Sequence, residues 1–372
     1  MITVLARYER ISLFHTMEPF FQENRRRRKR GEPGLFHFTQ SAEWCLRRDK
    51  NRTLFMERCF QYREPRDLGP GELALMRRLR EKYETIVFFC GQPEAGPNRL
   101  DLLPFVDRLF YKSVFSDKKD YRKKLYGKNL FADYYHSRYG VTDDPEYSGG
   151  EAPPGAGERA GLSWNIGVGS YPRRHWPQRG GTVLARLDLP GLGRILGGGI
   201  GGGRPPPDFS GERRGIAVHA RIDPVSCPSI AYQRRLFLDR ISRFEPPEAS
   251  LFLTGLVPQT RYYRELDDSK IVLSPFGWGE VCFRDFEAVL AGALLFKPDM
   301  SHLKTWPNIY LPHETYVPLN WDGTDLREKT KQYLGDEKER RRIAENAYVQ
   351  YREELAGLTA RFNALLGDVM SR

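Results

Sequence analysis

The sequence predicts an α/β protein with two domains, each built on a parallel β-sheet, and a C-terminal helix. Three observations support this fold. The 372 residues are enough for two domains that each bury a hydrophobic core. Short apolar strands alternate with helices in two separate stretches, which is the pattern of parallel sheets. A segment rich in glycine and proline lies between the two stretches.

The first α/β stretch covers residues 1–165. Ile2–Leu5 and Thr85–Cys90 are short apolar runs of the kind found in strands that are buried on both faces. A charged helix is expected at Leu73–Tyr83, directly before the second of these strands. These runs predict an N-terminal α/β domain.

Glycine and proline dominate residues 166–212. Gly197–Gly203 is almost entirely glycine, and Pro205–Pro207 is a proline run. Such a segment buries too little apolar surface to offset the chain entropy lost on folding, so we expect a linker or an insertion. Gly191–Gly197 has the wrong glycine spacing for a dinucleotide-binding loop, and we expect no phosphate site there.

The second α/β stretch covers residues 213–340. Its expected strands are 216–220, 250–254, 270–274 and 294–296, and its expected helices are 230–241, 259–266 and 280–290. Ligands of parallel sheets bind beyond the carboxyl ends of the strands. The loops after Ala220, Thr254 and Ser274 are therefore predicted to share one crevice.

Residues 341–372 are predicted to form one helix with a single apolar face. Apolar side chains recur there at intervals of three and four residues, which aligns them along one side of a helix. They are Ile343, Ala347, Tyr351, Leu355, Leu358, Phe362, Leu365 and Val369.

Composition excludes several classes of protein. The longest apolar runs, such as Ala288–Phe296, are far shorter than the roughly 20 residues of a membrane-spanning helix, and residues 1–6 are too short for a signal peptide. The 5 cysteines and 7 histidines are scattered, which fits neither a disulfide framework nor a zinc site. We therefore expect a cytoplasmic protein without a bound metal ion.

The formal net charge of +11 favours acidic partners: nucleic acid, an anionic membrane surface or phosphate-bearing small molecules. The densest basic run, Arg25–Arg30, is expected in a loop, either as a solvated tract or as a surface that attracts anionic lipid. Tyrosine and lysine interleave at Tyr121–Tyr139, where we favour a surface helix over a site for nucleic acid or sugars.

The most informative segment is Ser274–Gly292. A buried strand runs into a loop that holds Gly277 and Gly279, and a helix follows directly. Glycines let the backbone approach a ligand, and the start of a helix offers unpaired N–H groups to an anion. The segment therefore predicts a binding site for a phosphate group.

Three charged side chains are expected on one face of that helix. Glu280, Arg284 and Glu287 are four and then three residues apart, and this spacing aligns them. Such a face is either a salt-bridged surface or a binding site, in which Arg284 contacts phosphate oxygens and Glu287 accepts hydrogen bonds from hydroxyl groups. We favour binding, because the helix starts at the ligand edge of the sheet.

Phe283–Gly292, which follows Ser274-Pro-Phe-Gly, resembles the donor-binding domain of GT-B glycosyltransferases. The resemblance is to exostosin-like and family-1-like bacterial enzymes with an R-x-x-E-A-x-x-x-G signature, and it covers about residues 215–345. It implies two Rossmann-like domains that face a central cleft, with the acceptor on the N-terminal side. It also implies transfer of a sugar from a nucleotide-sugar to a glycan, lipid-linked or natural-product acceptor.

By this resemblance Glu287 would hold the ribose, and Arg284 would bind the diphosphate together with the backbone of the Gly277–Glu280 loop. Arg221 or Arg234 would add positive charge from neighbouring loops. Leu253–Tyr263 resembles the segment beside the nucleotide base. The residues expected around the donor are Gly277, Trp278, Gly279, Glu280, Arg284, Glu287, Arg221, Arg234 and Val257.

Three residues are candidates for catalysis. Glu280 would lie nearest the reacting end of the donor. An inverting reaction needs a base for the acceptor hydroxyl, and His15 and Glu18 in the loop-like stretch Phe14–Pro19 are candidates. Many retaining members carry two glutamates eight positions apart, whereas Glu280 and Glu287 are seven apart, so the stereochemistry stays open. The chain has no DxD motif, so neither a metal ion nor another cofactor is expected.

Two other classes of function compete with the transferase. One is a basic nucleic-acid-binding protein, which we consider the weaker hypothesis. The other is a non-catalytic interaction protein with a GT-B-like fold. The basic composition also leaves open a peripheral location at the inner face of the membrane.

Overall fold

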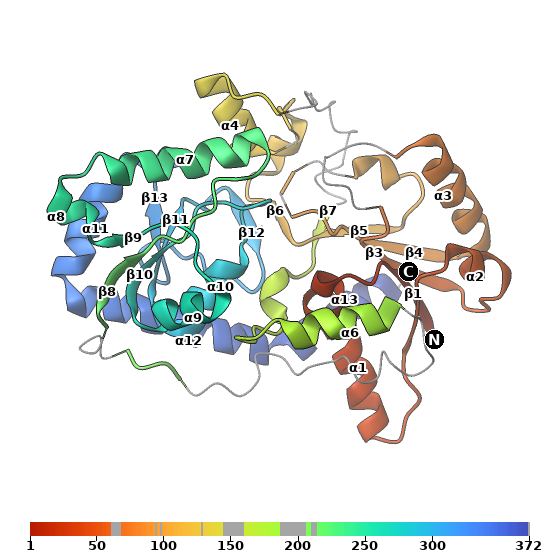
Figure 1. Cartoon of the computed structure of the whole chain (residues 1–372). Coiled ribbons are helices and arrows are strands. Elements are labelled where there is room, and N and C mark those ends of the chain that lie inside the picture. Colours follow the sequence, from red (N-terminus) through yellow and green to blue (C-terminus); the bar gives the residue numbers. More distant parts are fainter. Residues whose placement is uncertain are drawn as a thin grey trace. The chain divides into compact units, whose positions relative to one another are not determined.

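The computed structural model describes residues 1–60, 68–93, 95–96, 99–127, 129–143, 160–186, 206–209 and 214–370. The chain forms two compact units. The first combines Met1–Lys124, Gly150–Gly202 and Leu355–Arg372, and the second combines Leu125–Gly149 and Gly203–Glu354. Both units are α/β, as predicted (Figure 1). Each unit collects segments that are far apart in the sequence.

The first unit contains a six-stranded sheet in the order β2-β1-β3-β4-β5-β7, and its neighbouring strands are parallel. Both β2 and β3 pair with β1, on opposite sides, so the winding of the chain reverses between β1 and β3. Such a switch point opens a crevice at the carboxyl ends of the strands. The strands of this unit are β1 (Ile2–Ala6), β2 (Phe36–Thr39), β3 (Thr53–Glu57), β4 (Thr85–Phe89), β5 (Arg108–Tyr111), β6 (Ser113–Phe115) and β7 (Ala160–Leu162).

Helices cover both faces of this sheet. Side chains alternate along each strand, so neighbouring residues of one strand pack against helices on opposite faces. Met56 of β3 packs in one core with Met76 of α3. Phe55 belongs to the opposite face, where its ring centroid lies 6.1 Å from that of Phe20 in α1. The helical elements are η1 (Ser12–Thr16, a π-helix), α1 (Glu18–Lys29), α2 (Ala42–Arg47), α3 (Pro70–Lys82), η2 (Leu100–Leu102), η3 (Lys118–Arg122), η4 (Ile166–Val168), α6 (Trp176–Arg186) and α13 (Leu358–Met370).

Three local predictions about the first unit are wrong. Arg25–Lys29 forms the last turns of α1 instead of a loop, with Arg30 as the C-cap, and of residues 14–19 all but Met17 lie in η1 or α1. Pro19 in the first turn favours the start of α1, and Phe20 and Phe21 anchor it in the core. The predicted linker also contains α6. Gly191–Gly203 lies outside the described residues.

The second unit contains a five-stranded sheet in the order β13-β11-β10-β8-β9, again with parallel neighbours. Both β9 and β10 pair with β8, on opposite sides, so the switch point lies between β8 and β10. The four predicted strands are confirmed within two residues at each end. The strands are β8 (Ile216–His219), β9 (Phe252–Leu253), β10 (Ser269–Leu273), β11 (Leu294–Pro298), β12 (Leu303–Thr305) and β13 (Val317–Leu319).

Alternation along the strands also divides this unit into two faces. Ile271 and Leu273 of β10 pack with Phe237 of α7 in one hydrophobic core. The opposite face carries polar side chains, among them His219 of β8 and Lys297 of β11. The helices are α4 (Leu130–Tyr139), α7 (Pro228–Ser242), α8 (Pro246–Ala249), α9 (Gln259–Asp267), α10 (Phe283–Ala291), α11 (Leu326–Gly335) and α12 (Glu337–Ala356).

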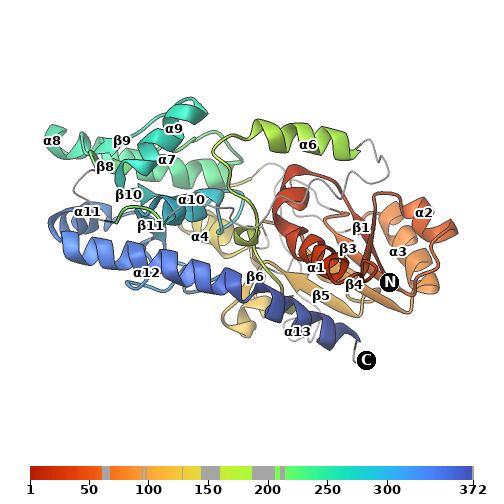
Figure 2. The ribbon, with the colours of Figure 1, turned by 90° about the horizontal axis from the view of Figure 1, so that it is seen from below.

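The C-terminal segment forms two helices, α12 and α13, instead of the single helix that was predicted (Figure 2). The chain turns at Gly357 between them. The eight residues of the predicted apolar stripe are all buried. Those up to Tyr351 belong to the second unit, whereas the later ones belong to the first. One continuous sequence pattern therefore serves two separate cores.

The tyrosine-rich stretch at 121–139 is less exposed than a surface helix would be. Tyr121 and Tyr135 are fully buried. Tyr135 of α4 donates a hydrogen bond to the carbonyl of Trp321 and packs against Tyr232 of α7, with 5.9 Å between ring centroids. These tyrosines therefore serve packing.

Candidate functional site

The switch point of the second sheet brings together the loops after β8 and β10. The loop after β10 covers residues 274–282 and leads into α10. Arg284, in the first turn of α10, donates a hydrogen bond to the carbonyl of Arg221, directly after β8. Arg221 Nη1 also donates to the Thr254 carbonyl after β9, so all three loops that were predicted to share a crevice are linked by hydrogen bonds.

A buried polar network holds the start of α10. The Asp285 carboxylate accepts hydrogen bonds from the Ser274 hydroxyl at 2.6 Å, the Tyr310 hydroxyl at 2.7 Å and the Cys282 N–H at 2.8 Å. It also forms an ion pair with Lys297, whose Nζ lies 2.9 Å away, and both side chains are fully buried. The ion pair links β11 to α10. Sequence reasoning missed this pair, because Asp285 and Lys297 stand twelve residues apart with no shared motif.

This network also sets where α10 begins. The sequence predicted a helix over 280–290, but α10 starts at Phe283, since Cys282 is its N-cap and Asp285 caps the Cys282 N–H. Glu280 therefore lies in the loop, and the prediction that it shares a helix face with Arg284 and Glu287 is wrong.

Glu280 is almost fully buried within the loop, with 1% of its surface exposed. Its Oε1 lies 3.7 Å from Nε2 of His302, in the segment that follows β11. The His302 ring packs edge-on against Trp321 at 5.0 Å between centroids. Glu280 is thus held next to a histidine instead of projecting from the helix.

The glycines of the loop form a tight turn. The Gly277 N–H donates to the Gly279 carbonyl at 2.9 Å. A Cβ on Gly277 would lie 3.2 Å from Sγ of Cys282, closer than side chains normally pack. Trp278, between the two glycines, is half-exposed. The loop therefore brings its backbone and one aromatic ring to the carboxyl edge of the sheet.

Arg234 of α7 reaches the same loop. Its Nε donates to the Phe276 carbonyl at 3.3 Å, and its Nη1 donates to the Asp223 carbonyl at 2.8 Å. Burial lowers the pKa of Arg234, and the positive charge of Arg284 lowers it further. The two guanidinium groups are therefore close enough to repel each other. Nε of Arg284 is buried and has no hydrogen-bond partner among the described residues.

Glu287 is held by two tyrosines of α9. Its Oε2 accepts from the Tyr262 hydroxyl and its Oε1 from the Tyr263 hydroxyl, both at 2.8 Å. A carboxylate has about four lone-pair sites, so two acceptor positions are left. The tyrosines fix the direction in which those positions point.

The Arg221 side chain has a structural role within the second unit. Its Nε and Nη2 form a bidentate ion pair with the Glu265 carboxylate, with both N···O distances at 2.7 Å. Its Nη1 donates to the Thr254 carbonyl. All three nitrogen atoms thus have partners inside the unit, and the side chain ties the loops after β8 and β9 together. Val257, expected beside the nucleotide base, is half-buried in the loop between β9 and α9.

His219, at the end of β8, was not predicted as a site residue. It is fully buried, and neither ring nitrogen has a hydrogen-bond partner in the ranges that the structure describes. Its ring meets that of Tyr262 edge-on at 5.0 Å between centroids. Burial, together with the charge of Arg284, lowers the pKa of His219 to about 3, so the ring is neutral at pH 7.

The two catalytic candidates of the first unit are both buried. Nδ1 of His15 lies 3.0 Å from the Ile166 carbonyl, and burial lowers the pKa of His15 to about 3. Glu18 forms an ion pair with Arg25, and burial raises the pKa of Glu18 to about 7. His15 is closely packed, whereas Glu18 is tied into α1.

A stretch that runs from β8 to the first residues of α13 matches a known family. The sequence model of the family described as "Glycosyl transferase-like" matches residues 217–364. This range contains the 274–282 loop, α9 and α10. No curated protein matches the chain.

Several solved structures are similar to the chain at low identity. They include HepE of Anabaena in complex with UDP, with 10% identity, 99% of each chain covered and a TM-score of 0.47. An alpha-glucosyltransferase in complex with UDP and a 13-mer DNA has 10% identity, full coverage of both chains and a TM-score of 0.49. A trehalose-phosphate synthase of Burkholderia vietnamiensis has 13% identity, covers 86% of this chain and 71% of its own, and has a TM-score of 0.40.

Among the described residues, no three His, Cys, Asp or Glu side chains are grouped so that they could hold a metal ion. Within the same ranges, none of the helices is both long and apolar enough to cross a bilayer.

Proposed function

We propose that the chain is a glycosyltransferase of the GT-B type, and that its second unit binds a nucleotide-sugar donor at the 274–282 loop. The sugar would pass to a glycan, lipid-linked or small-molecule acceptor. The proposal places the donor diphosphate next to Arg284 and Arg234. It places the ribose next to Glu287.

One observation carries this proposal: Arg234 contacts the glycine loop, the charge of Arg284 in the first turn of α10 acts on it, and Nε of Arg284 is buried without a partner among the described residues. Like charges held close together destabilise each other, and a bound anion relieves that repulsion. A buried donor without an acceptor is also costly until a ligand fills it. A diphosphate meets both requirements, and its oxygen atoms match the geometry of guanidinium groups.

Glu287 supports the nucleoside part of the proposal. A carboxylate whose two oxygen atoms are already oriented by Tyr262 and Tyr263 loses little freedom when it accepts further hydrogen bonds. The two hydroxyl groups of a ribose are donors at a suitable spacing. We also propose that the guanidinium groups and the start of α10 stabilise the leaving diphosphate without a metal ion.

A thermal-shift screen tests the donor proposal. Wild-type protein is heated with UDP-, GDP-, CMP- and dTDP-sugars, and we expect at least one of them to raise the Tm. Arg284→Ala and Arg234→Ala should each weaken that nucleotide by about 100-fold, because each removes a charged hydrogen-bond donor from a partly buried site.

The control is Arg235→Ala. Arg235 is the exposed neighbour of Arg234 on α7 and carries the same charge, so its removal should leave the affinity unchanged. If no nucleotide-sugar stabilises the wild type, or if Arg235→Ala weakens binding as much as Arg234→Ala, the donor site is misplaced.

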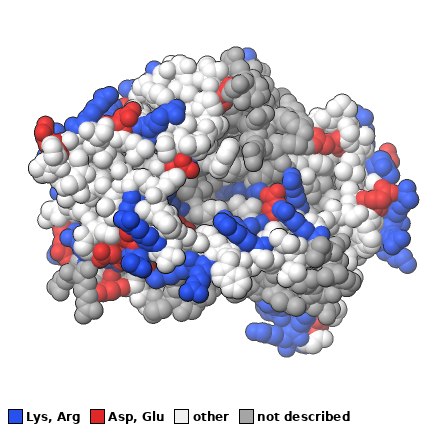
Figure 3. Space-filling model, in the orientation of Figure 1, with Lys and Arg blue, Asp and Glu red and all other residues white. Residues whose placement is uncertain are grey.

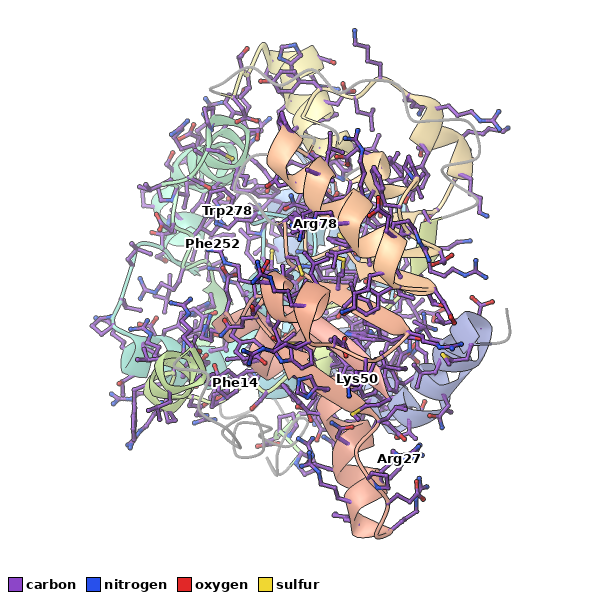
Figure 4. All side chains as sticks on the ribbon, turned by 90° about the vertical axis from the view of Figure 1, so that its right-hand side faces the viewer. Phe14, Arg27, Lys50, Arg78, Phe252 and Trp278 are labelled. Atoms are coloured by element: carbon purple, nitrogen blue, oxygen red, sulfur yellow. The ribbon has the colours of Figure 1, made fainter. Side chains whose placement is uncertain are left out.

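A second proposal concerns the location of the protein. Arg25, Arg26 and Lys29 of α1 line a cavity of about 280 Å³ that α13 closes with Thr359 and Phe362. Figure 3 shows Lys and Arg atoms gathered where α1 ends, and Figure 4 shows Arg27 at that end. We propose that this end of α1 docks on an anionic membrane surface, since each cation near such a surface contributes about 1 kcal/mol.

Vesicle sedimentation tests the docking proposal. We expect binding to phosphatidylcholine vesicles only when they contain phosphatidylserine. The double variant Arg28→Ala/Lys29→Ala should bind at least tenfold more weakly, and salt should weaken the wild type further. Arg77→Ala/Arg78→Ala, which removes two exposed cations from α3, is the matched control. Equal losses in the two double variants would contradict a specific role for α1.

A further inference from the structure

A cavity of about 590 Å³ opens at the amino edge of the first sheet, and cavities of this size hold small molecules. Its lining includes Ile2 and Thr53, the first residues of β1 and β3, and Leu35, which directly precedes β2. The other wall comes from the last turns of α13, whose end lies beside the start of β1 in Figures 1 and 2. Parallel sheets bind their substrates at the carboxyl ends of the strands, so this cavity lies at the other edge.

Both walls of the cavity are largely apolar. Leu366 and Met370 line it from α13, and Ile2 and Leu35 line it from the sheet. Ile2 is 3% exposed, whereas Met370 is 58% exposed, so the lining reaches from a buried floor to an open mouth. An apolar chain that enters from solvent would be removed from water along these walls. A flat membrane surface could not reach the buried floor.

Gly367 keeps space open on the α13 side of the cavity. A Cβ at this position would meet nothing within 4 Å. Glycine weakens a helix interior compared with alanine, and close packing does not require it here. The glycine therefore leaves a volume that a larger side chain would occupy, and this volume adjoins the apolar walls.

Positive charge lies at the mouth of the cavity. Lys50 belongs to the lining, is exposed, and forms no ion pair in the part of the chain that the structure describes. Arg52 pairs with Glu84 at 3.0 Å, but both side chains are more than half exposed, so water screens this pair. Asp49 is buried and accepts a hydrogen bond from the Tyr83 hydroxyl at 2.7 Å. The mouth therefore attracts an anion.

We propose that this cavity binds a single-chain anionic amphiphile. Its acyl chain lies between α13 and the sheet, and its carboxylate or phosphate head lies at Lys50 and Arg52. The apolar walls select the chain, and the two cations select the sign of the head group. The ligand contacts both α13 and the sheet, so its binding should raise the Tm. This inference does not depend on the proposed glycosyl transfer.

A displacement assay tests the class of ligand. Full-length protein binds dansyl-aminoundecanoic acid, whose fluorescence rises in an apolar site, at about 0.15 M salt and with each amphiphile below its micelle concentration. We expect dodecanoate and dodecyl phosphate to displace this probe. Dodecyltrimethylammonium should do so about tenfold more weakly, because its head has the wrong charge. Equal displacement by the cationic amphiphile, or no binding of the probe, would overturn the proposal.

Filling the cavity tests where the ligand binds. Gly367→Leu places a side chain in the open space beside α13, so dodecanoate should bind about tenfold more weakly. The Tm without ligand should stay equal or rise, because leucine favours a helix. Gly180→Leu is the matched control, since Gly180 is a glycine of α6 with equally open surroundings outside the cavity. Wild-type affinity in Gly367→Leu would contradict binding in this cavity.

Removal of the cations tests the head group. Lys50→Ala/Arg52→Ala should weaken dodecanoate by about threefold to tenfold, as for partly exposed ion pairs, and should leave the affinity for uncharged dodecanol unchanged. Arg47→Ala/Arg48→Ala removes two exposed arginines of the same segment that do not line the cavity. Equal losses in the two double variants would overturn the proposed role of Lys50 and Arg52. Binding to phosphatidylserine vesicles without any binding of dodecanoate would assign this surface to a membrane instead.

Discussion

The carboxyl edges of the two sheets share one topology but differ in how their charges are satisfied. In the second unit, Arg221 pairs with Glu265, Lys297 pairs with Asp285, and Glu287 is held by two tyrosines. In the first unit, Glu57 is buried, accepts a hydrogen bond from the Thr16 hydroxyl, and has its pKa raised by burial. The charges at the second edge are thus paired with one another, whereas at the first edge a buried carboxylate is held by a neutral hydroxyl group. A shared fold therefore leaves the chemistry of each site to a few side chains.

The strongest test of the comparison is removal of the buried cation in the second unit. Lys297→Met leaves Asp285 charged and buried, and we expect it to lower the free energy of unfolding by about 3–5 kcal/mol in urea titrations. Lys304→Met, at an exposed lysine of β12, should change it by less than about 0.5 kcal/mol. A small effect of Lys297→Met would mean that the network does not stabilise this edge.

Close packing in the first unit gives the next largest effect. A Cβ at Gly169 would lie 2.0 Å from Nδ1 of His15 and 2.5 Å from the Phe14 carbonyl. Gly169→Ala should therefore cost about 2–3 kcal/mol of unfolding free energy. Gly180→Ala is the control, since its Cβ meets nothing within 4 Å and the residue lies in α6. That change should stabilise the protein slightly. Equal stabilities of the two variants would show that His15 can move aside.

The Arg221–Glu265 pair predicts a pH dependence in the second unit. Hydrogen bonds from Arg221, and then from Arg261, lower the pKa of Glu265. Its contribution is therefore present above the pKa of the unfolded chain and is lost as the pH falls through the lower pKa of the folded protein. Glu265→Gln should cost about 1–2 kcal/mol at pH 7.

Denaturant titrations from pH 7 to pH 3 check this dependence. The difference between wild type and Glu265→Gln should shrink once the pH falls below about 4.5, the usual pKa of a glutamate. Glu353→Gln, at an exposed position of α12, should follow the wild type throughout. A difference that stays constant with pH would mean that the charge of Glu265 is not what matters.

The smallest expected effect concerns Trp278. Its side chain is 51% exposed at the donor loop, so Trp278→Ala should leave the Tm unchanged. It should weaken the nucleotide-sugar by roughly fivefold, which corresponds to about 1 kcal/mol. Trp176→Ala removes a tryptophan that is 71% exposed in the first unit and should have no effect on the donor. If Trp278→Ala and Trp176→Ala bind the donor with the same affinity, Trp278 does not contact the donor.

Local patterns were enough to predict much of the fold and the position of the glycine loop in the candidate site. Strand and helix periodicity gave the order of elements in the second unit, and the glycine loop before α10 identified the edge of the sheet where the match to a transferase family lies. Periodicity and glycine content are properties of neighbouring residues, so the sequence contains them directly. The start of α10 was misplaced because a buried capping network, not periodicity, determines it.

The sequence by itself determined the α/β class and the position of the glycine loop, and it predicted the residues that we propose contact a diphosphate. Only the tertiary structure decided which of the polar and charged side chains pair with one another. Arg221 and Glu265 stand 44 residues apart, and Thr16 and Glu57 stand 41 apart. The two halves of the C-terminal stripe also enter different cores. Such pairings depend on strand order and burial, which bring distant residues together and leave no local pattern in the chain.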